Sequence, residues 1–132
     1  MIGLDTNVLV RYIVRDDPAQ TDAATRLIES RCTVEARGFV SLIVLAELVW
    51  VLSRGYRYGK PIIIKVLRKI MAASELMVEE PPLVWAALSD YEQGKADFPD
   101  YLIARRNQAA GCDHTFSFDL KTQKHPLFAV PP

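Results

Sequence analysis

Four carboxylate residues are spread along the chain, and each lies in or beside an apolar stretch: Asp5, Glu47, Asp100 and Asp119. An ionised carboxylate buried without a partner is unstable by several kcal/mol, so such groups are paired, protonated or bound to a cation. No basic residue stands three or four positions from Glu47, which interrupts the apolar run over residues 42–52. One shared divalent cation would satisfy all four charges, and this arrangement favours nuclease chemistry.

Three of the acids also have a purely structural interpretation. Asp5 begins the first expected helix, where an aspartate often caps backbone N–H groups. Asp119 suits an ordinary turn. Asp97 is expected to cap the helix that contains Asp100, whose charge at the third position favours the helix dipole. For Asp97 we prefer this structural interpretation, whereas Glu47, with apolar neighbours on both sides, favours a functional carboxylate by itself.

The ligand types indicate which cation would be bound. Mg²⁺ and Mn²⁺ favour oxygen ligands, and either ion could polarise a phosphodiester and lower the pKa of a water molecule. Without a cation, clustered carboxylates would repel one another and raise one another's pKa values. His114 and His125 form no zinc-type spacing with Cys32 and Cys112, so zinc is not expected.

Short apolar strands alternate with helical stretches along the chain. The expected strands cover residues 1–4, 38–40, 76–78, 114–118 and 127–130. This alternation predicts a single domain over residues 1–132, a three-layer α/β/α sandwich around a mostly parallel sheet of four or five strands. Because ligands of such sheets bind beyond the carboxyl ends of the strands, we expect the four acids to converge there.

The composition is that of an ordinary globular protein, with 16 basic and 16 acidic residues. No targeting segment is visible at the start of the chain. The apolar run over residues 42–52 is too short for a bilayer span and contains Glu47. We therefore expect a soluble cytoplasmic protein that does not associate with membranes and whose two cysteines are free thiols.

Positive charge gathers over residues 48–74, where no acidic residue occurs. One turn of this stretch alternates cations with aromatic rings: Arg54, Tyr56, Arg57, Tyr58 and Lys60. Cations suit the phosphates of single-stranded RNA, and rings suit its unstacked bases. Arg105, after Asp100, is a further candidate RNA contact. Two alternatives stay open, namely a solvated helix face and a docking surface for an acidic segment of a partner.

Four short motifs resemble, in order and spacing, those of the PIN-domain family. They are Asp5-Thr6-Asn7, Ser41 with Ala46-Glu47-Leu48, the run from Ala96 to Ala104, and Ser117-Phe118-Asp119. The resemblance covers essentially the whole chain, and the compact length is similar to VapC-type toxins of toxin–antitoxin pairs. It implies a Mg²⁺- or Mn²⁺-dependent endoribonuclease, usually a homodimer, that a cognate VapB-type antitoxin protein holds inactive.

The resemblance also implies roles for individual residues. Asp5 and Asp100 would be the principal metal ligands, and Glu47 and Asp119 would complete the catalytic cluster. Four further residues would support them: Thr6, Asn7, Ser117 and Asp97. Ser117 stands where the family usually has threonine or serine, and it would support Asp119 by hydrogen bonding. Asp97 is an additional acid outside the four core positions.

Two other classes of function can be weighed against a nuclease. A catalytically idle PIN-like module would bind RNA or protein without cleaving it, but such a module would gain nothing from four clustered charges. A receiver-type signalling domain also has an acidic magnesium pocket on an α/β sheet. It requires a phosphoacceptor aspartate at mid-chain and a lysine after a late strand, and neither has a convincing counterpart here.

Overall fold

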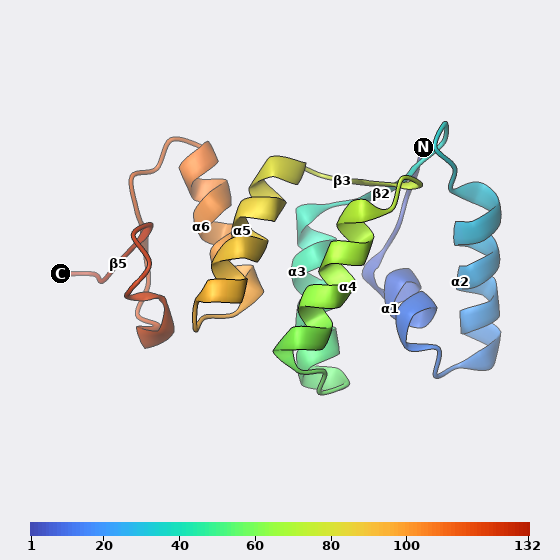
Figure 1. The fold of residues 1–132 in the computed structure, drawn as a ribbon, viewed down its shortest axis with the longest axis horizontal. Helices are drawn as coiled ribbons and strands as arrows, with labels where there is room; N and C mark the ends of the chain where they lie inside the picture. The colour runs from blue at the N-terminus through green and yellow to red at the C-terminus, as the bar shows by residue number, and fades with distance from the viewer. The chain divides into compact units, whose positions relative to one another are not determined.

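The structure is a computed structural model that describes residues 1–132 (Figure 1). The backbone divides into two compact units, Met1–Glu79 and Glu80–Pro132. None of the helices combines the length and the apolar character that a membrane span requires.

The first unit is an α/β fold built on a parallel sheet. Its elements are β1 (Ile2–Gly3), α1 (Thr6–Val14), α2 (Pro18–Arg31), β2 (Gly38–Val40), α3 (Leu42–Trp50), η1 (Val51–Gly55, a π-helical turn), α4 (Lys60–Ala72) and β3 (Leu76–Val78). The strands pair in the order β1-β2-β3, with Ile2 opposite Gly38 and Gly38 opposite Leu76. Because helices connect successive strands, all pairings are parallel, and the three carboxyl ends lie at one edge.

In the first unit, α3 packs against α1, and α4 packs against β3. The fully buried side chains of this unit are Leu9, Val40, Leu45, Leu48, Leu52, Ile63 and Leu67. Local signals start the helices as the sequence indicates. The Asp17 carboxylate accepts a hydrogen bond from Gln20 N–H at 3.1 Å, directly before Pro18 at the first position of α2. Ser41 Oγ likewise accepts one from Val44 N–H at 3.2 Å and caps α3.

The second unit is built on a pair of helices. Its elements are α5 (Pro81–Gln93), α6 (Phe98–Ala109), β4 (Thr115–Phe116), η2 (Leu120–Thr122, a 3-10 turn) and β5 (Phe128–Ala129). The helices α5 and α6 pack against each other, and the ring of Phe98 lies edge-on to Tyr91 at 6.0 Å. β4 and β5 pair in parallel, with Thr115 opposite Phe128. Tyr101 packs edge-on against Phe128 and links α6 to β5.

The α/β class and the parallel pairing agree with the sequence prediction. All five expected strands occur, although those near residues 1–4, 114–118 and 127–130 are each two residues long in the structure. Three strands pair in the first unit and two in the second. A single domain over residues 1–132 stays a prediction.

Candidate functional site

In the first unit, Asp5 lies two residues after the end of β1, at the carboxyl edge of the parallel sheet. It occupies the N-cap position of α1 with an extended backbone, but its side chain makes no capping hydrogen bond. The residue is exposed. A helix cap therefore accounts for the position of Asp5 but leaves its carboxylate free to bind a ligand.

Glu47 reaches back from α3 toward the same edge. Thr6 is buried directly after Asp5, and its Oγ1 donates a hydrogen bond to Glu47 Oε1 at 3.2 Å. A helical side chain leans toward the N-terminus of its helix, which explains this direction. The structure thus brings Glu47 beside the first motif. Asn7, in the first turn of α1, is exposed.

The expectation that Glu47 is buried in a helix that is apolar nearly all round is wrong, because Glu47 is exposed. Only one side of α3 is buried, by Val44, Leu45, Leu48 and Val49. On the other side, Ile43 is 73% exposed and Trp50 is 60% exposed, and Glu47 lies between them at helical spacing. Burial alone therefore does not require a cation at Glu47. Its contact with Thr6 is the remaining structural support for a functional role.

Glu79 is an acid at the same edge that sequence reasoning missed. It directly follows β3, and one oxygen of its carboxylate accepts the backbone N–H of Leu42 at 3.0 Å. This bond satisfies a free donor at the start of α3, so it supports a structural role. An acidic residue directly after an expected strand is the signal that could have identified it.

In the second unit, Asp97 and Asp100 form a capping box at the start of α6. Asp97 N–H donates to Asp100 Oδ2 at 3.1 Å, and Asp100 N–H donates to the Asp97 carbonyl at 3.0 Å. This confirms the structural interpretation of Asp97 as an N-cap. It also fixes the Asp100 carboxylate over the first turn of the helix.

The carboxyl group of Asp100 has a perturbed pKa. Burial raises its pKa above the ordinary value, and the hydrogen bond from Asp97 works in the opposite direction. The charges of Asp119 and Asp97 raise the pKa further, while Lys121 lowers it. Three carboxylates of the second unit therefore share one electrostatic environment, in which an added cation would relieve repulsion.

Asp119 follows β4 and caps η2. Its Oδ1 accepts the backbone N–H of Lys121 at 2.9 Å, and its own N–H donates to Ser117 Oγ at 3.0 Å. The turn-residue interpretation is thus confirmed. Ser117 holds the backbone of Asp119, and one carboxylate oxygen of this exposed aspartate has no hydrogen-bond partner.

The basic turn after α3 is held in place by hydrogen bonds. Tyr56 donates its hydroxyl proton to Asp16 at 2.9 Å and accepts a hydrogen bond from Arg11 at 3.2 Å. The Tyr56 hydrogen bond, followed by the contact with Arg11, holds the pKa of Asp16 below its ordinary value. The turn exposes Arg54 and also Arg57, which has a left-handed φ of 57°. A non-glycine residue in this conformation is uncommon, so the turn fixes a defined position for its side chain.

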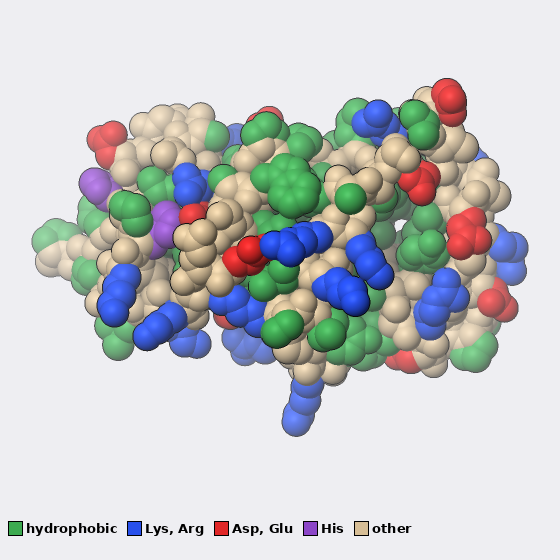
Figure 2. All heavy atoms as spheres, viewed as in Figure 1, with side chains coloured by type: hydrophobic (Ala, Val, Ile, Leu, Met, Phe, Trp, Pro, Cys, Tyr) green, Lys and Arg blue, Asp and Glu red, His purple; other side chains and the backbone are tan.

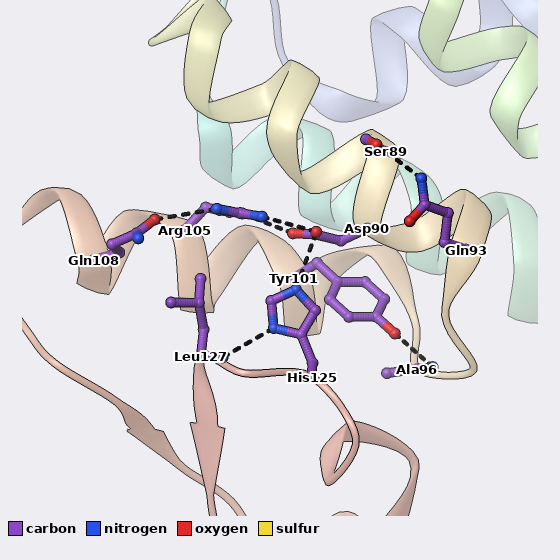
Figure 3. A network of polar contacts seen from close by, with 9 residues as sticks. All are labelled: Ser89, Asp90, Gln93, Ala96, Tyr101, Arg105, Gln108, His125 and Leu127. Atoms are coloured by element: carbon purple, nitrogen blue, oxygen red, sulfur yellow. Dashed lines mark hydrogen bonds and ion pairs between the residues drawn. The ribbon is translucent and has the colours of Figure 1, made fainter.

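The Arg105 side chain is held by a polar network of the second unit (Figure 3). Its guanidinium donates to both carboxylate oxygens of Asp90, at 2.7 and 2.8 Å, and His125 Nε2 lies 3.0 Å from the same carboxylate. Burial alone would raise the pKa of Asp90, but the hydrogen bonds from Arg105 and His125 outweigh burial and lower it. Sequence reasoning missed this network. It gives Arg105 a structural role, so RNA contact by Arg105 stays a prediction without support here.

The donor chemistry of the candidate acids fits a hard cation, because all four offer carboxylate oxygens and none is a sulfur or nitrogen ligand. No group of three or more His, Cys, Asp or Glu side chains in the structure is arranged to hold a metal ion. Both cysteines are free, with Cys32 buried and Cys112 exposed.

Comparison with known proteins assigns the family. The PIN domain model matches residues 2–125. The chain belongs to the PIN domain family. It is also similar to the VapC ribonuclease of Aquifex aeolicus (strain VF5), with 25% identity over 129 residues that cover 98% of this chain and 95% of that protein. The family match includes all four motifs from which the resemblance was inferred.

Proposed function

We propose that this PIN-family chain is a divalent-metal-dependent endoribonuclease and the toxin of a VapBC-type toxin–antitoxin pair. The observation that carries this proposal is the PIN match over residues 2–125, which spans all four acidic positions. The near end-to-end similarity to a protein named VapC ribonuclease supports the toxin assignment. The carboxylate coupling around Asp100 supports a demand for a cation in the second unit.

Each candidate acid has a role in this proposal. Asp5 and Asp100 are the principal ligands of Mg²⁺ or Mn²⁺, and Glu47 and Asp119 complete the catalytic set. When bound, the ion supplies charge neutralisation at the scissile phosphodiester and activation of a water molecule. The remaining residues of the site position the acids.

Three hydrogen bonds support the positioning roles. Thr6 holds Glu47 through its hydroxyl, and Ser117 holds the backbone of Asp119. Asp97 positions Asp100 through the capping box. Asn7 follows in the first turn of α1. Its exposed amide can contact whatever binds to Asp5.

Replacing Asp5 with asparagine tests the proposal. Asparagine keeps the size of the side chain and removes the charge, so Mn²⁺-dependent cleavage of single-stranded RNA should be abolished. Thermal stability should stay equal or rise, because Asp5 makes no capping hydrogen bond that the change would break. The measurement is a cleavage assay with Mg²⁺ or Mn²⁺, together with a thermal melt.

Asp22→Asn provides the matched control, because Asp22 is an exposed aspartate on α2 outside the proposed site. It should cleave as the wild type does. Retained cleavage by Asp5→Asn would remove Asp5 from the mechanism, and gross loss of folding would favour a helix-cap role. If the wild-type chain binds RNA but cleaves none with either metal, the idle PIN-like module replaces the enzyme.

We further propose that Arg54 and Arg57 contact RNA phosphates from the anchored turn, with Lys60 at the start of α4 as an additional contact. Lys and Arg side chains also gather over α4 on the face seen in Figure 2. In Arg54→Ala/Arg57→Ala, the slope of log affinity against log salt should flatten by about 0.7 per lost contact with single-stranded RNA. Fluorescence anisotropy across a salt series measures the slope, and a slope equal to that of Arg26→Ala/Arg31→Ala would discard these contacts.

The partners proposed for the chain are an RNA substrate, a cognate VapB-type antitoxin and a second copy of itself, acting in the cytoplasm. They rest on the motif resemblance and on the similarity to the Aquifex protein. Light scattering of the purified chain tests the homodimer, and a monomer at every concentration would exclude it. Co-expression with the product of an adjoining reading frame tests the antitoxin.

A further inference from the structure

A pocket of about 520 Å³ opens in the second unit beside the Asp90 network. Its walls come from the end of α5, the loop before α6, α6 itself and the segment over residues 120–126. Its volume lies within the range of roughly 300–1,000 Å³ that is typical of ligand sites. None of its lining residues belongs to the candidate acid set.

The pocket carries a strong excess of positive charge. Four cations line it, namely Lys95, Arg105, Lys121 and Lys124, against the single carboxylate of Asp90. Asp90 is already neutralised by its bidentate pair with Arg105. The three lysines are exposed and form no ion pair in their unit. A hollow lined by one sign of charge concentrates ligands of the opposite sign, so an anion is the expected occupant.

One wall of the pocket is formed by side chains of the polar network that Figure 3 shows. His125 Nδ1 accepts the backbone N–H of Leu127 at 3.1 Å, so the ring proton is on Nε2 and points to Asp90 at 3.0 Å. The imidazole is therefore held by two contacts. The Tyr101 ring lies 5.5 Å from it, and the Tyr101 hydroxyl accepts Ala96 N–H at 3.2 Å. A wall ordered before binding reduces the entropic cost of holding a ligand.

The loops that line the pocket also carry candidate acids. Lys95 precedes Asp97 by two residues, and Lys121 follows Asp119 by two residues. The charge of Lys121 acts on Asp100 and lowers its pKa. If one phosphate of an RNA strand lies at these acids, the lysines of the same unit can therefore bind a neighbouring phosphate of that strand.

We propose that this pocket binds the phosphate backbone of the RNA strand next to the cleaved bond, with Lys95, Lys121 and Lys124 as its phosphate contacts. This subsite rests on the proposed ribonuclease function. A free phosphate shares the same chemistry. An RNA strand fits the pocket better than a free phosphate does, because the two loops that carry the lysines also carry the proposed site acids.

The test measures binding of a single-stranded RNA in EDTA, where no metal-dependent cleavage occurs, to Lys95→Ala/Lys124→Ala across a salt series. Two lost contacts should flatten the slope of log affinity against log salt by about 1.4. From about 50 to about 200 mM salt, the wild type should then lose about sevenfold more affinity than the variant. With Mn²⁺, the variant should show a raised KM and a nearly unchanged kcat, because the lysines bind the strand without acting on the scissile bond.

Arg26→Ala/Arg31→Ala removes two exposed cations of α2 and is the matched control, which should keep the wild-type slope. The single variant Lys124→Gln should flatten the salt slope by half as much. It replaces the double variant in the test if the double variant does not fold. If the wild type cleaves RNA while the lysine variants keep its slope and KM, the subsite is wrong and the nuclease stands. If the wild type neither binds nor cleaves RNA, both are wrong. Protection from heat by inorganic phosphate in the wild type alone, with RNA slopes unchanged, would assign the pocket to free phosphate.

Discussion

Asp100 is held between opposing influences that determine its charge. Burial and the charges of Asp119 and Asp97 raise its pKa, whereas the hydrogen bond from Asp97 N–H and the charge of Lys121 lower it. The net direction is upward, so the folded chain retains the proton at a higher pH than the unfolded chain does. Ionised Asp100 is therefore disfavoured in the folded state, first by burial and then by the neighbouring carboxylates, and a bound cation would offset both effects.

Asp100→Asn should make this destabilisation measurable. Because the folded wild type binds the proton more tightly, its stability should fall as pH rises from the ordinary aspartate value of 3.8 through the raised pKa of Asp100. Asparagine cannot ionise, yet its side-chain oxygen can still accept Asp97 N–H. Below the ordinary aspartate pKa, the variant should be no more stable than the wild type. Above the raised pKa of Asp100, the variant should be the more stable of the two. Thermal melts in EDTA across pH measure this difference, and a variant less stable at neutral pH would contradict it.

At the scale of the element, the ends of helices were predictable and their buried faces were not. Asp97 occupies the N-cap position of α6 as expected, because capping depends on residues three positions apart. The exposure of Glu47 depends on which side of α3 packs, and composition does not encode that choice. The Asp90–Arg105–His125 network joins residues that are 15 or more positions apart in sequence, so no local sequence pattern predicts it.

Gly94, at the end of α5, lies close against the side chain of Tyr101. It ends α5 with φ at −103°, a conformation open to any residue. A side chain there would meet the Tyr101 ring, with a Cβ lying 2.8 Å from Cζ and closer still to the hydroxyl oxygen. Glycine is therefore required by the close approach of Tyr101, which also accepts Ala96 N–H.

Gly94→Ala should displace Tyr101 and destabilise the fold by about 1–3 kcal/mol, the usual cost of overpacking. Denaturant unfolding measures the loss. Gly55→Ala is the control, since a Cβ there meets only Val51 Cγ1 at 3.8 Å. Equal stability of the two variants would show that Tyr101 yields without cost.

At the scale of the whole molecule, the proposed catalytic acids are divided between the two compact units. Asp5 and Glu47 belong to the first unit, and Asp100 and Asp119 belong to the second. The PIN match runs through both. If Asp5 and Asp100 ligate the same ion, binding must depend on residues from each unit. The ion should also stabilise the folded chain, by about 2.7 kcal/mol at a hundredfold excess over its Kd.

Isothermal titration of Mn²⁺ into the wild type, Asp5→Asn and Asp100→Asn tests this dependence most directly. A shared site predicts saturable binding in the wild type that weakens by at least about tenfold in both variants. Asp22→Asn should bind as the wild type does. Wild-type Mn²⁺ affinity in either Asp5→Asn or Asp100→Asn would contradict a metal site built from both acids.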